Sequence, residues 1–173
     1  MSNLYVQPSY DHPDHDWHVL PAAVFGASGV LGSAIMQRES KVFAADYRLD
    51  DEPYGAFWQS RVAYLCAGTK GFAECEGNRA AFRADVDGNI RLARHLLKQG
   101  TFVLFVSTDA VEWALHTAYA RNRFMVELAI GSQPNVAIVR PSKFSAETVG
   151  PLADLCVKIG TERLEGLHYW WPR

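Results

Sequence analysis

The chain has 173 residues, of which 49% are hydrophobic and 21% are charged, and its formal net charge is −2. This composition is typical of one ordinary globular domain and excludes a disordered chain. The small net charge argues against binding to nucleic acid or acidic membranes, and no apolar run approaches the roughly 20 residues that span a bilayer. The first residues lack the basic and apolar segments of a secretory signal, so we expect a cytoplasmic protein.

The sequence contains a group of His and Asp residues and three cysteines, but we predict neither a metal site nor a disulfide from them. Residues 1–18 contain six potential metal ligands: Asp11, His12, Asp14, His15, Asp16 and His18. No companion cluster occurs elsewhere, so we interpret residues 1–18 as a flexible leader, predict no metal site, and assign residues 19–173 to one domain. The three cysteines are odd in number and widely spaced, which predicts buried structural thiols: Cys66, Cys75 and Cys156.

Short apolar segments alternate with segments of helical periodicity along the rest of the chain. The apolar segments predict strands at residues 20–26, 41–46, 61–68, 101–107 and 135–140. Helical spacing predicts helices at residues 30–39, 78–100, 116–131 and 150–160, two of which end at Gly100 and Gly131. Strands that are apolar throughout and alternate with helices form a parallel sheet covered on both faces. The expected fold is therefore α/β, a Rossmann-like doubly wound parallel sheet in a single domain.

A glycine-rich segment, GASGVLG at residues 26–32, lies directly between the first predicted strand and the first predicted helix. In such a turn, glycines allow the backbone to approach a pyrophosphate, which the N–H groups at the start of the helix can bind. A glycine-rich turn without a ligand is the alternative. We predict that the turn binds a dinucleotide through Gly26, Ser28, Gly29, Val30, Leu31 and Gly32.

The end of the second predicted strand should contact the adenosine ribose of such a dinucleotide. Asp46 lies 20 residues after Gly26, at the position from which a carboxylate accepts hydrogen bonds from ribose hydroxyls. A carboxylate there repels a 2′-phosphate and favours NAD, whereas Arg48 could pair with that phosphate and favour NADP. The sequence therefore predicts NAD or NADP as the cofactor, with NAD slightly favoured.

Tyr119 and Arg123 lie four residues apart in the predicted helix at residues 116–131. Residues with this spacing lie on one helix face, so both side chains can point into the same cleft. Tyrosine side chains in general titrate near ~10, and a nearby cation favours the phenolate, which suits proton transfer at neutral pH. The alternative is a tyrosine packed at a dimer face, with Arg121 and Arg123 as solvated charges.

The glycine turn is followed by VAYLCAG, FVSTDAV, YARNR and VRPSKF, in an order that resembles the extended short-chain dehydrogenase/reductase family. The likeness covers residues 22–144 and is greatest to the dTDP-4-dehydrorhamnose reductase branch. It implies a homodimer that oxidises, reduces, epimerises or dehydrates a small polar, sugar-like substrate at a carbonyl or hydroxyl group. Tyr119 would be the acid/base, with Arg123 as its partner, and Thr108 or Ser107 would bind the substrate oxygen. The resemblance places these residues beside the cofactor: Ala67, Gly68, Asp85, Pro141 and Ser142.

Two of these positions depart from the pattern of the family. Arg123 stands where the family has lysine, and Asp85 stands where it has asparagine. Arginine keeps the positive charge and can donate to ribose hydroxyls, but it is planar, bulkier and unable to relay a proton. The two changes favour the alternative function, which is a catalytically silent NAD(P)-binding sensor or a subunit of a larger complex.

The spacing of the segments departs from the family as well. Only 14 residues lie between Asp46 and Arg61, which predicts that one strand–helix unit is reduced or lost. Only 29 residues follow Phe144, so we expect the C-terminal substrate region to be largely absent. The terminal aromatic segment is expected to pack on the domain or on a partner subunit, with a lid over the cleft as the alternative: Tyr169, Trp170 and Trp171.

Overall fold

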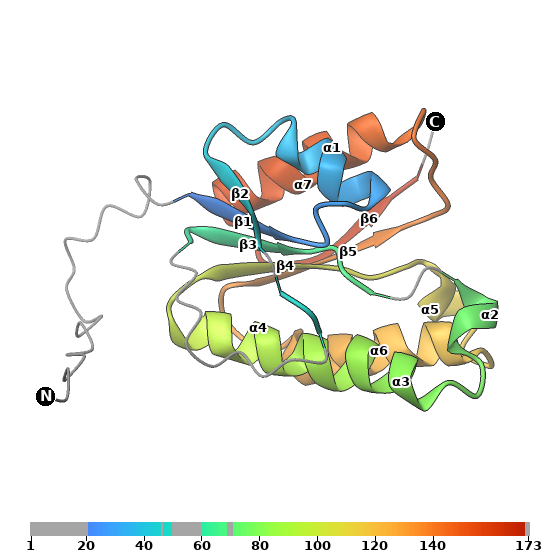
Figure 1. Ribbon diagram of the computed structural model, residues 1–173. Coiled ribbons are helices and arrows are strands. Elements are labelled where there is room, and N and C mark those ends of the chain that lie inside the picture. The colour runs from blue at the N-terminus through green and yellow to red at the C-terminus, as the bar shows by residue number, and fades with distance from the viewer. Residues whose placement is uncertain (1–20, 46, 50–59, 69–70, 172–173) are drawn as a thin grey trace, which may run out of the picture.

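The computed structural model describes residues 21–45, 47–49, 60–68 and 71–171. Six parallel strands form one sheet in the order β2-β1-β3-β4-β5-β6 (Figure 1). The strands are β1 (Ala22–Phe25), β2 (Val42–Ala45), β3 (Val62–Leu65), β4 (Phe102–Val106), β5 (Val136–Pro141) and β6 (Gly166–Trp170). The predicted α/β, Rossmann-like parallel sheet is confirmed.

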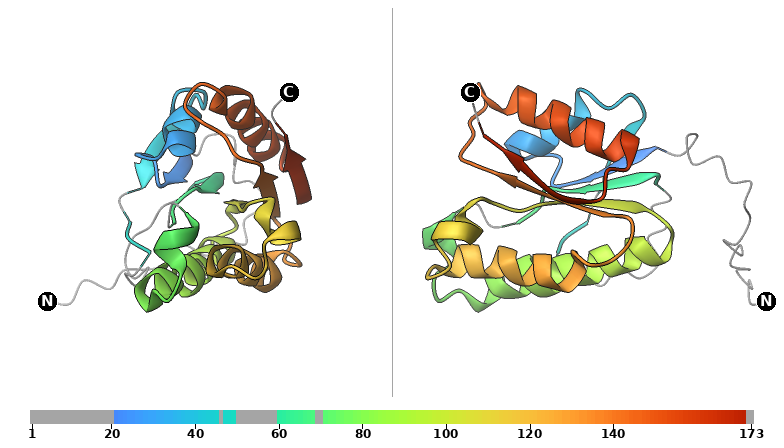
Figure 2. Two further views of the ribbon diagram at one scale, coloured as in Figure 1. Left: turned by 90° about the vertical axis from the view of Figure 1, so that its right-hand side faces the viewer. Right: turned by 180° about the vertical axis from the view of Figure 1, so that it is seen from behind.

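Helices cover both faces of the sheet (Figure 2). α1 (Val30–Met36) and α7 (Val149–Glu162) pack together on one face, and α4 (Asn89–Lys98) and α6 (Ala118–Ile130) lie on the other. The shorter helices are α2 (Phe72–Cys75), α3 (Arg79–Phe82), the π-helical turn η1 (Arg83–Gly88) and α5 (Ala110–Trp113). α2 and α5 lie at the edge of the sheet where β3 and β4 end, on the right in Figure 1.

The core consists of two apolar layers, one on each side of the sheet. Val24 of β1 packs in the layer under α1 and α7, and the next residue, Phe25, packs in the layer against α4 and α6. Every residue of β1 and β3 is buried. Because both faces of these strands are covered, both sets of side chains must be apolar, which explains the continuous apolar segments of the sequence.

A buried polar cluster lies at the amino ends of β1 and β3. Glu39 is 6% exposed, accepts a hydrogen bond from Tyr64 Oη at 3.0 Å, and pairs with Arg61. Gly160 of α7 lies against the same tyrosine, because a Cβ at this position would stand 2.5 Å from Oη. Burial and the adjacent Glu39 carboxylate raise the pKa of Tyr64 above its usual value. The cluster therefore joins the end of α1, β3 and α7 at the edge opposite the strand carboxyl ends.

The order of the strands creates a switch point between β1 and β3. The chain passes from β1 through α1 to β2 on one side, and then returns to β3 on the other side of β1. After β3 it continues through α3, η1 and α4 on the opposite face of the sheet. Loops that diverge to opposite faces open a crevice at the carboxyl ends of the two strands, and ligands bind there in open α/β sheets.

The structure differs from the sequence prediction at the C-terminal end. Residues 166–170 form β6, which pairs with β5 and was not predicted. Trp170 is 8% exposed and packs in the core, so the expected packing on the domain is confirmed for this residue. Tyr169 and Trp171 remain 42% and 55% exposed. Only Trp170 of this edge strand is buried, so the segment has no continuous apolar run that would predict a strand.

The long helix predicted at residues 78–100 is also interrupted. Its middle is the π-helical turn η1, which lies between α3 and α4 and contains Asp85. A Cβ at Gly88 would stand 2.0 Å from Leu49 O, so this turn lies directly on the backbone that follows β2. Single π-helical turns inside helices often mark functional sites. Gly100 ends the helix with a φ of 77°, as predicted.

Several predictions concern residues outside the described part of the chain. These are the leader at residues 1–18, with its histidines, Asp46, and most of the short connection between β2 and β3. Within the described ranges, no helix is both long and apolar enough to cross a membrane. In the same ranges, no three His, Cys, Asp or Glu side chains gather as metal ligands would. The cysteines do not form disulfides with one another; Cys75 and Cys156 are buried, as predicted, whereas Cys66 is only partly buried.

Candidate functional site

The predicted site residues come together at the carboxyl ends of four neighbouring strands. The glycine turn follows β1, Ala67 and Gly68 follow β3, Ser107 and Thr108 follow β4, and Ser142 follows β5. Backbone hydrogen bonds hold these ends in register: Cys66 N donates to Phe25 O, Ser107 N to Val139 O, and Asp109 N to Pro141 O. The parallel sheet therefore assembles one edge from segments that are far apart in the sequence.

In the glycine turn, the backbone packs so closely against neighbouring backbone atoms that side chains would not fit at Gly26 and Gly32. Gly26 has a φ of 85°, and a Cβ there would stand 2.7 Å from Ala67 N. A Cβ at Gly32 would stand 2.2 Å from Gly26 O, so the first turn of α1 lies on the strand end itself. Gly29 N donates to Gly26 O at 3.0 Å. These contacts require glycine at both ends of the turn.

The start of α1 leaves its backbone donors available to a ligand. Gly29 is the N-cap residue, and no side-chain hydrogen bond caps this helix in the part of the chain that the structure describes. Leu31 is 4% exposed and anchors the helix in the core, whereas Val30 is 47% exposed. Initial N–H groups without a cap are the donors that bind a pyrophosphate in this type of turn. The residues present therefore fit a dinucleotide.

An open hollow lies beside α2, α3 and η1, near the end of β3, and no residue of the glycine turn lines it. It is bordered by Arg48 and Leu49 after β2, by Gly68, and by residues of α2, α3 and η1 that include Arg79 and Arg83. Arg48 is exposed at its rim. Asp46 lies outside the described residues, so the choice between NAD and NADP stays a prediction.

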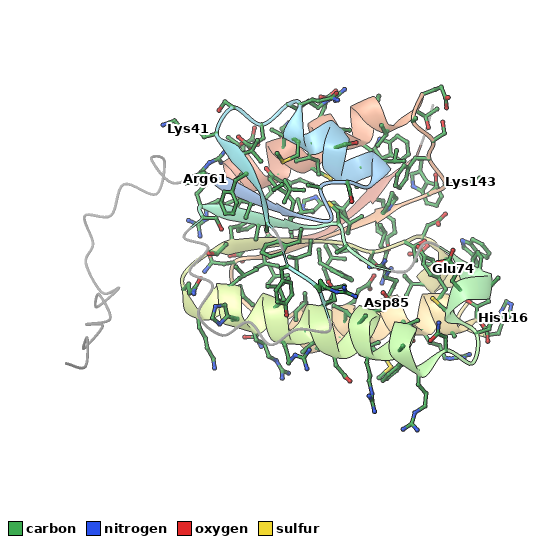
Figure 3. All side chains as sticks on the ribbon, viewed as in Figure 1. Lys41, Arg61, Glu74, Asp85, His116 and Lys143 are labelled. Atoms are coloured by element: carbon green, nitrogen blue, oxygen red, sulfur yellow. The ribbon has the colours of Figure 1, made fainter. Side chains whose placement is uncertain are left out.

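Arg123 and Asp85 both point at the backbone of Gly68. A Cβ at Gly68 would stand 2.4 Å from Arg123 Nη2 and 3.0 Å from Asp85 Oδ1. Arg123 is 6% exposed and Asp85 is 1% exposed, so both charged groups are buried. Figure 3 shows Asp85 between the lower helix layer and the sheet. The two positions that depart from the family pattern thus meet at one point of the site, which their separation in the sequence did not reveal.

Tyr119 and Arg123 lie on the same face of α6, as predicted. The guanidinium carbon of Arg123 stands 5.7 Å from the centre of the Tyr119 ring. Tyr119 is half-buried, and Phe72 of α2 covers it edge-on, with ring centres 5.2 Å apart. Trp113 of α5 stands 6.3 Å from Phe72. The sequence analysis missed these two aromatic neighbours because they come from short helices that have no periodic pattern.

Ser107 and Thr108 lie at the end of β4 and are 4% and 8% exposed. Thr108 Oγ1 accepts a hydrogen bond from Ala110 N at 3.3 Å and so supports the start of α5. Ser107 Oγ is buried and has no hydrogen-bond partner among the described residues. Ser142 N donates to Trp170 O, which joins the end of β5 to β6. Of the hydroxyl groups of Ser107 and Thr108, that of Ser107 is therefore the one still able to donate a hydrogen bond to a ligand.

Arg140 of β5 fixes α6 on the sheet. Its guanidinium donates to both carboxylate oxygens of Glu127, with Nε to Oε1 at 3.0 Å. It also donates to Glu112 of α5 at 3.1 Å and to Tyr169 Oη of β6 at 3.0 Å. The Glu127 carboxylate raises the pKa of Arg140 above its usual value. This cluster positions the helix that holds Tyr119 and Arg123.

We expect the free energy of unfolding to fall as the pH rises above about 9. Cys66 packs against the core layer under α1 and α7, and burial raises the pKa of its thiol from 9.0 to about 12, against the opposing effect of Arg123. Burial raises the pKa of Cys156 in the same direction. Because the unfolded chain releases these protons first, the contribution is complete below pH 9 and is lost as the pH rises toward 12.

Denaturant unfolding at about pH 8 and about pH 10 measures this loss, with an upper limit of ~1.4 kcal/mol per pH unit for each thiol. The Cys66→Ala variant should lose less stability over the same interval than the unmodified chain. An equal loss in both proteins would contradict the assignment to Cys66.

The fold and the glycine turn define a Rossmann-like α/β protein with a candidate dinucleotide site. No protein-family model matches the sequence, and no curated protein matches it. Solved structures do match. The dTDP-4-dehydrorhamnose reductase of Clostridium acetobutylicum superposes with a TM-score of 0.76 and 17% identity, over 87% of this chain and 74% of that chain. A hypothetical dTDP-4-dehydrorhamnose reductase of Sulfolobus tokodaii gives 0.75 and 16%, over 87% and 76%.

The dTDP-4-dehydrorhamnose reductase of Bacillus anthracis, solved in complex with NADP, gives a TM-score of 0.75 and 16% identity, over 87% of this chain and 74% of that chain. The chain therefore has the fold of the dTDP-4-dehydrorhamnose reductases. The resemblance seen in the sequence motifs is confirmed at the level of the fold.

Proposed function

We propose that the protein is an NAD(P)-dependent oxidoreductase or epimerase of the extended short-chain dehydrogenase/reductase type. The observation that carries the proposal is the approach of the glycine turn to Ala67, and of Arg123 to Gly68, at the carboxyl ends of β1 and β3, with Tyr119 beside Arg123 on α6. Ligands bind at such a point in open α/β sheets. The substrate would be a small polar, sugar-like molecule that reacts at a carbonyl or hydroxyl group, as the names of the structurally similar reductases suggest.

Each part of the site has a proposed role in binding. The backbone N–H groups at the start of α1 would bind the pyrophosphate, and the close approach at Gly26 and Gly32 leaves room for it. Arg48, at the rim of the hollow, supports binding of a 2′-phosphate, whereas Asp46 supports a free ribose hydroxyl. The nicotinamide supplies the hydride when it is bound.

The remaining roles concern the substrate. Tyr119 would exchange a proton with the substrate oxygen, because it is half-buried at the edge where the strands end. Thr108, or Ser107, whose hydroxyl has no hydrogen-bond partner in the described part of the chain, would hydrogen-bond the same oxygen. Phe72 and Trp113 would exclude water from Tyr119 on the side of α2 and α5.

A second function is favoured by one observation, the burial of Arg123 against Gly68 and Asp85. A cation held in this way is less able to reach a ribose hydroxyl or to support a tyrosinate. On this reading, the protein binds NAD(P) and reports its presence to a partner without turnover. We also propose a homodimer that uses α4 and α6, because Met125 and Leu128 on α6 are 44% and 67% exposed.

The experiment that tests these functions is a titration of the purified protein with NAD⁺, NADH, NADP⁺ and NADPH. We expect one redox pair to bind with a micromolar dissociation constant, and turnover of a panel of sugar aldehydes and ketones to follow. Tyr119→Phe should lower turnover about a hundredfold or more and leave the dissociation constant of the nucleotide within about twofold. Tyr10→Phe is the matched control, because Tyr10 belongs to the predicted leader at residues 1–18 and its loss should leave turnover unchanged.

Three outcomes separate the proposals. Binding followed by Tyr119-dependent turnover supports the enzyme. Binding without any turnover supports the sensor and overturns the enzyme. If none of the four nucleotides binds, both functions fail.

A further inference from the structure

The strand β6 lies at the end of the sheet and has an open outer edge. It pairs with β5 on one side, and among the residues that the structure describes no strand pairs with its other side (Figure 2). Ser142 N donates to Trp170 O, so the backbone of Trp170 points toward β5. Because successive residues of a strand direct their backbone groups to opposite sides, the N–H and C=O groups of Leu167 and Tyr169 point outward. The outer edge of β6 therefore offers these groups to another strand.

The side chains along this edge are apolar and exposed. Leu167, Tyr169 and Trp171 are 45%, 42% and 55% exposed. In the pairing with β5, Leu167 lies opposite Ile138 and Tyr169 lies opposite Arg140. Since Ile138 packs in the core layer against α4 and α6, Leu167 and Tyr169 lie on the same face of the sheet, at its margin. The open backbone edge thus carries an apolar strip.

This edge lacks the usual protection of an open strand. Edge strands in natural proteins commonly carry charged residues, especially lysine, or proline, which prevents pairing with another chain. Residues 166–170, with the sequence GLHYW, contain none of these. Glu165, directly before the strand, accepts a hydrogen bond from Asn135 N at 2.8 Å, so its carboxylate is engaged with the loop before β5. The edge is therefore suited to pairing with a further strand.

We propose that two copies of this chain pair through their β6 strands, which run antiparallel about a two-fold axis. Such an axis stands perpendicular to the joined sheet, so each face of one copy continues as the same face of the other. The apolar side chains Leu167 and Tyr169 then meet the same two side chains of the partner, and the outward N–H and C=O groups of both strands bond to each other. The strand is thus complementary to itself. It carries no charge that would select an oppositely charged partner, which favours a second copy.

The area of this contact predicts a weak, reversible association. An aromatic side chain contributes ~150–250 Å² when it is buried, so the three half-exposed side chains present on the order of 300 Å² per copy. With the strand backbones included, the two copies would bury about 1,000 Å², which is near the lower limit for a specific interface. We expect a dissociation constant of about 10 µM.

The β6 edge is separate from the helix surface of the homodimer proposed above. Met125 and Leu128 belong to α6, whereas the edge belongs to the last strand of the sheet. Because the two surfaces differ, both can be used in a closed assembly of four copies, with one two-fold interface of each kind. Pairing through β6 requires no nucleotide, so it can be tested apart from the proposed function.

The test is sedimentation velocity of the full chain and of Leu167→Lys, from about 1 to 300 µM. Lysine at this position places two like charges near the two-fold axis and should leave the fold intact, because the side chain is exposed. We expect the mass of the unmodified chain to double as the concentration rises. In Leu167→Lys the dissociation constant of that step should rise about tenfold or more.

Two control variants identify the surface involved. Leu115→Lys adds the same charge at a leucine that is 41% exposed and lies between α5 and α6, and it should associate as the unmodified chain does. Leu128→Lys should remove the helix contact and leave the concentration-dependent β6 step in place. A doubling from one copy to two and a doubling from two copies to four both support the β6 interface when Leu167→Lys alone removes that step.

Amide hydrogen exchange of the unmodified chain gives a second measurement, which decides the question even where Leu167→Lys does not fold. The outward N–H groups of Leu167 and Tyr169 should exchange about tenfold more slowly at the highest concentration than at the lowest, because they become hydrogen-bonded. The amides of the other edge strand, β2, are the internal control and should exchange at the same rate at both concentrations.

Three results would overturn the inference. The first is an unmodified chain whose mass stays constant over the whole concentration range. The second is a Leu167→Lys variant that associates as tightly as the unmodified chain, or no more weakly than Leu115→Lys. The third is exchange of the Leu167 and Tyr169 amides that does not change with concentration. If Leu128→Lys alone lowers the mass, the helix surface is the interface and the pairing of β6 is wrong.

Discussion

Gly32→Ala is expected to abolish nucleotide binding and to destabilise the fold, although alanine is the better helix former. The gain in helix propensity is only ~1 kcal/mol. The added Cβ would stand 2.2 Å from Gly26 O and 3.0 Å from the Cα of Ala27, both backbone atoms, so the turn must move. Overpacking of this kind costs about 1–3 kcal/mol, and a displacement of about 1 Å in a binding turn can cost about a hundredfold in function.

Thermal unfolding and the NAD(P) titration measure the two effects of Gly32→Ala. Gly71→Ala is the matched control, because Gly71 has an extended backbone with a φ of −175° and no atom within 4 Å of an added Cβ. It should leave both the unfolding midpoint and the nucleotide affinity unchanged. A Gly32→Ala variant that binds nucleotide as tightly as the Gly71→Ala variant would show that the turn is not the binding site.

Glu127→Gln is expected to cause a large loss of stability for such a conservative substitution. Glu127 is 6% exposed and receives hydrogen bonds from Nε and Nη2 of Arg140, whose side chain is only 12% exposed. Losing one partner of a buried pair costs about 3–5 kcal/mol when the remaining charge has no counter-charge. Arg140 keeps the partly exposed Glu112, so we expect a loss near the lower end, about 3 kcal/mol. Because α6 holds Tyr119 and Arg123, turnover should fall with stability as the helix loosens on the sheet.

Glu112→Gln removes the same charge from a more exposed partner of Arg140, and so shows how much of the Glu127 effect is due to burial. Glu112 accepts a hydrogen bond from the same Arg140 at 3.1 Å, but its side chain is 44% exposed. Solvent screens such a pair, and we expect a change of less than ~1 kcal/mol. Urea unfolding of both variants gives the comparison, and equal losses would show that the Glu127 pair contributes no more than a surface ion pair.

The α/β class, five of the six strands and the four main helices could be predicted from the sequence. Five strands and the four long helices follow from continuous apolar segments and helical periodicity, because burial on both faces of a parallel sheet leaves a strong local signal. β6 was missed because most of its residues are exposed and only Trp170 is buried, so this edge strand leaves no continuous apolar segment in the sequence. The π-helical turn was missed because it interrupts a helix without any change in its apolar pattern.

In the candidate site, too, some neighbours could be predicted from the sequence and others could not. Tyr119 and Arg123 could be placed on one face of a helix from their spacing, and the structure confirms that geometry. Their neighbours Phe72 and Trp113 could not be predicted, since they come from short helices whose position depends on the packing of α2 and α5 against α6. The predicted roles in chemistry stay predictions until the nucleotide titration is done.

The sequence by itself determined the glycine turn after β1, because the constraint is local: strand, tight turn and helix follow one another, and only glycine permits the contacts within that stretch. It also determined the α/β class, since periodicity is a property of neighbouring residues. The tertiary structure decided that Asp85 and Arg123 meet at Gly68 and that Arg140 fixes α6 on the sheet. These pairs join separate elements, and their energy depends on burial, which exists only once the sheet and both helix layers have assembled.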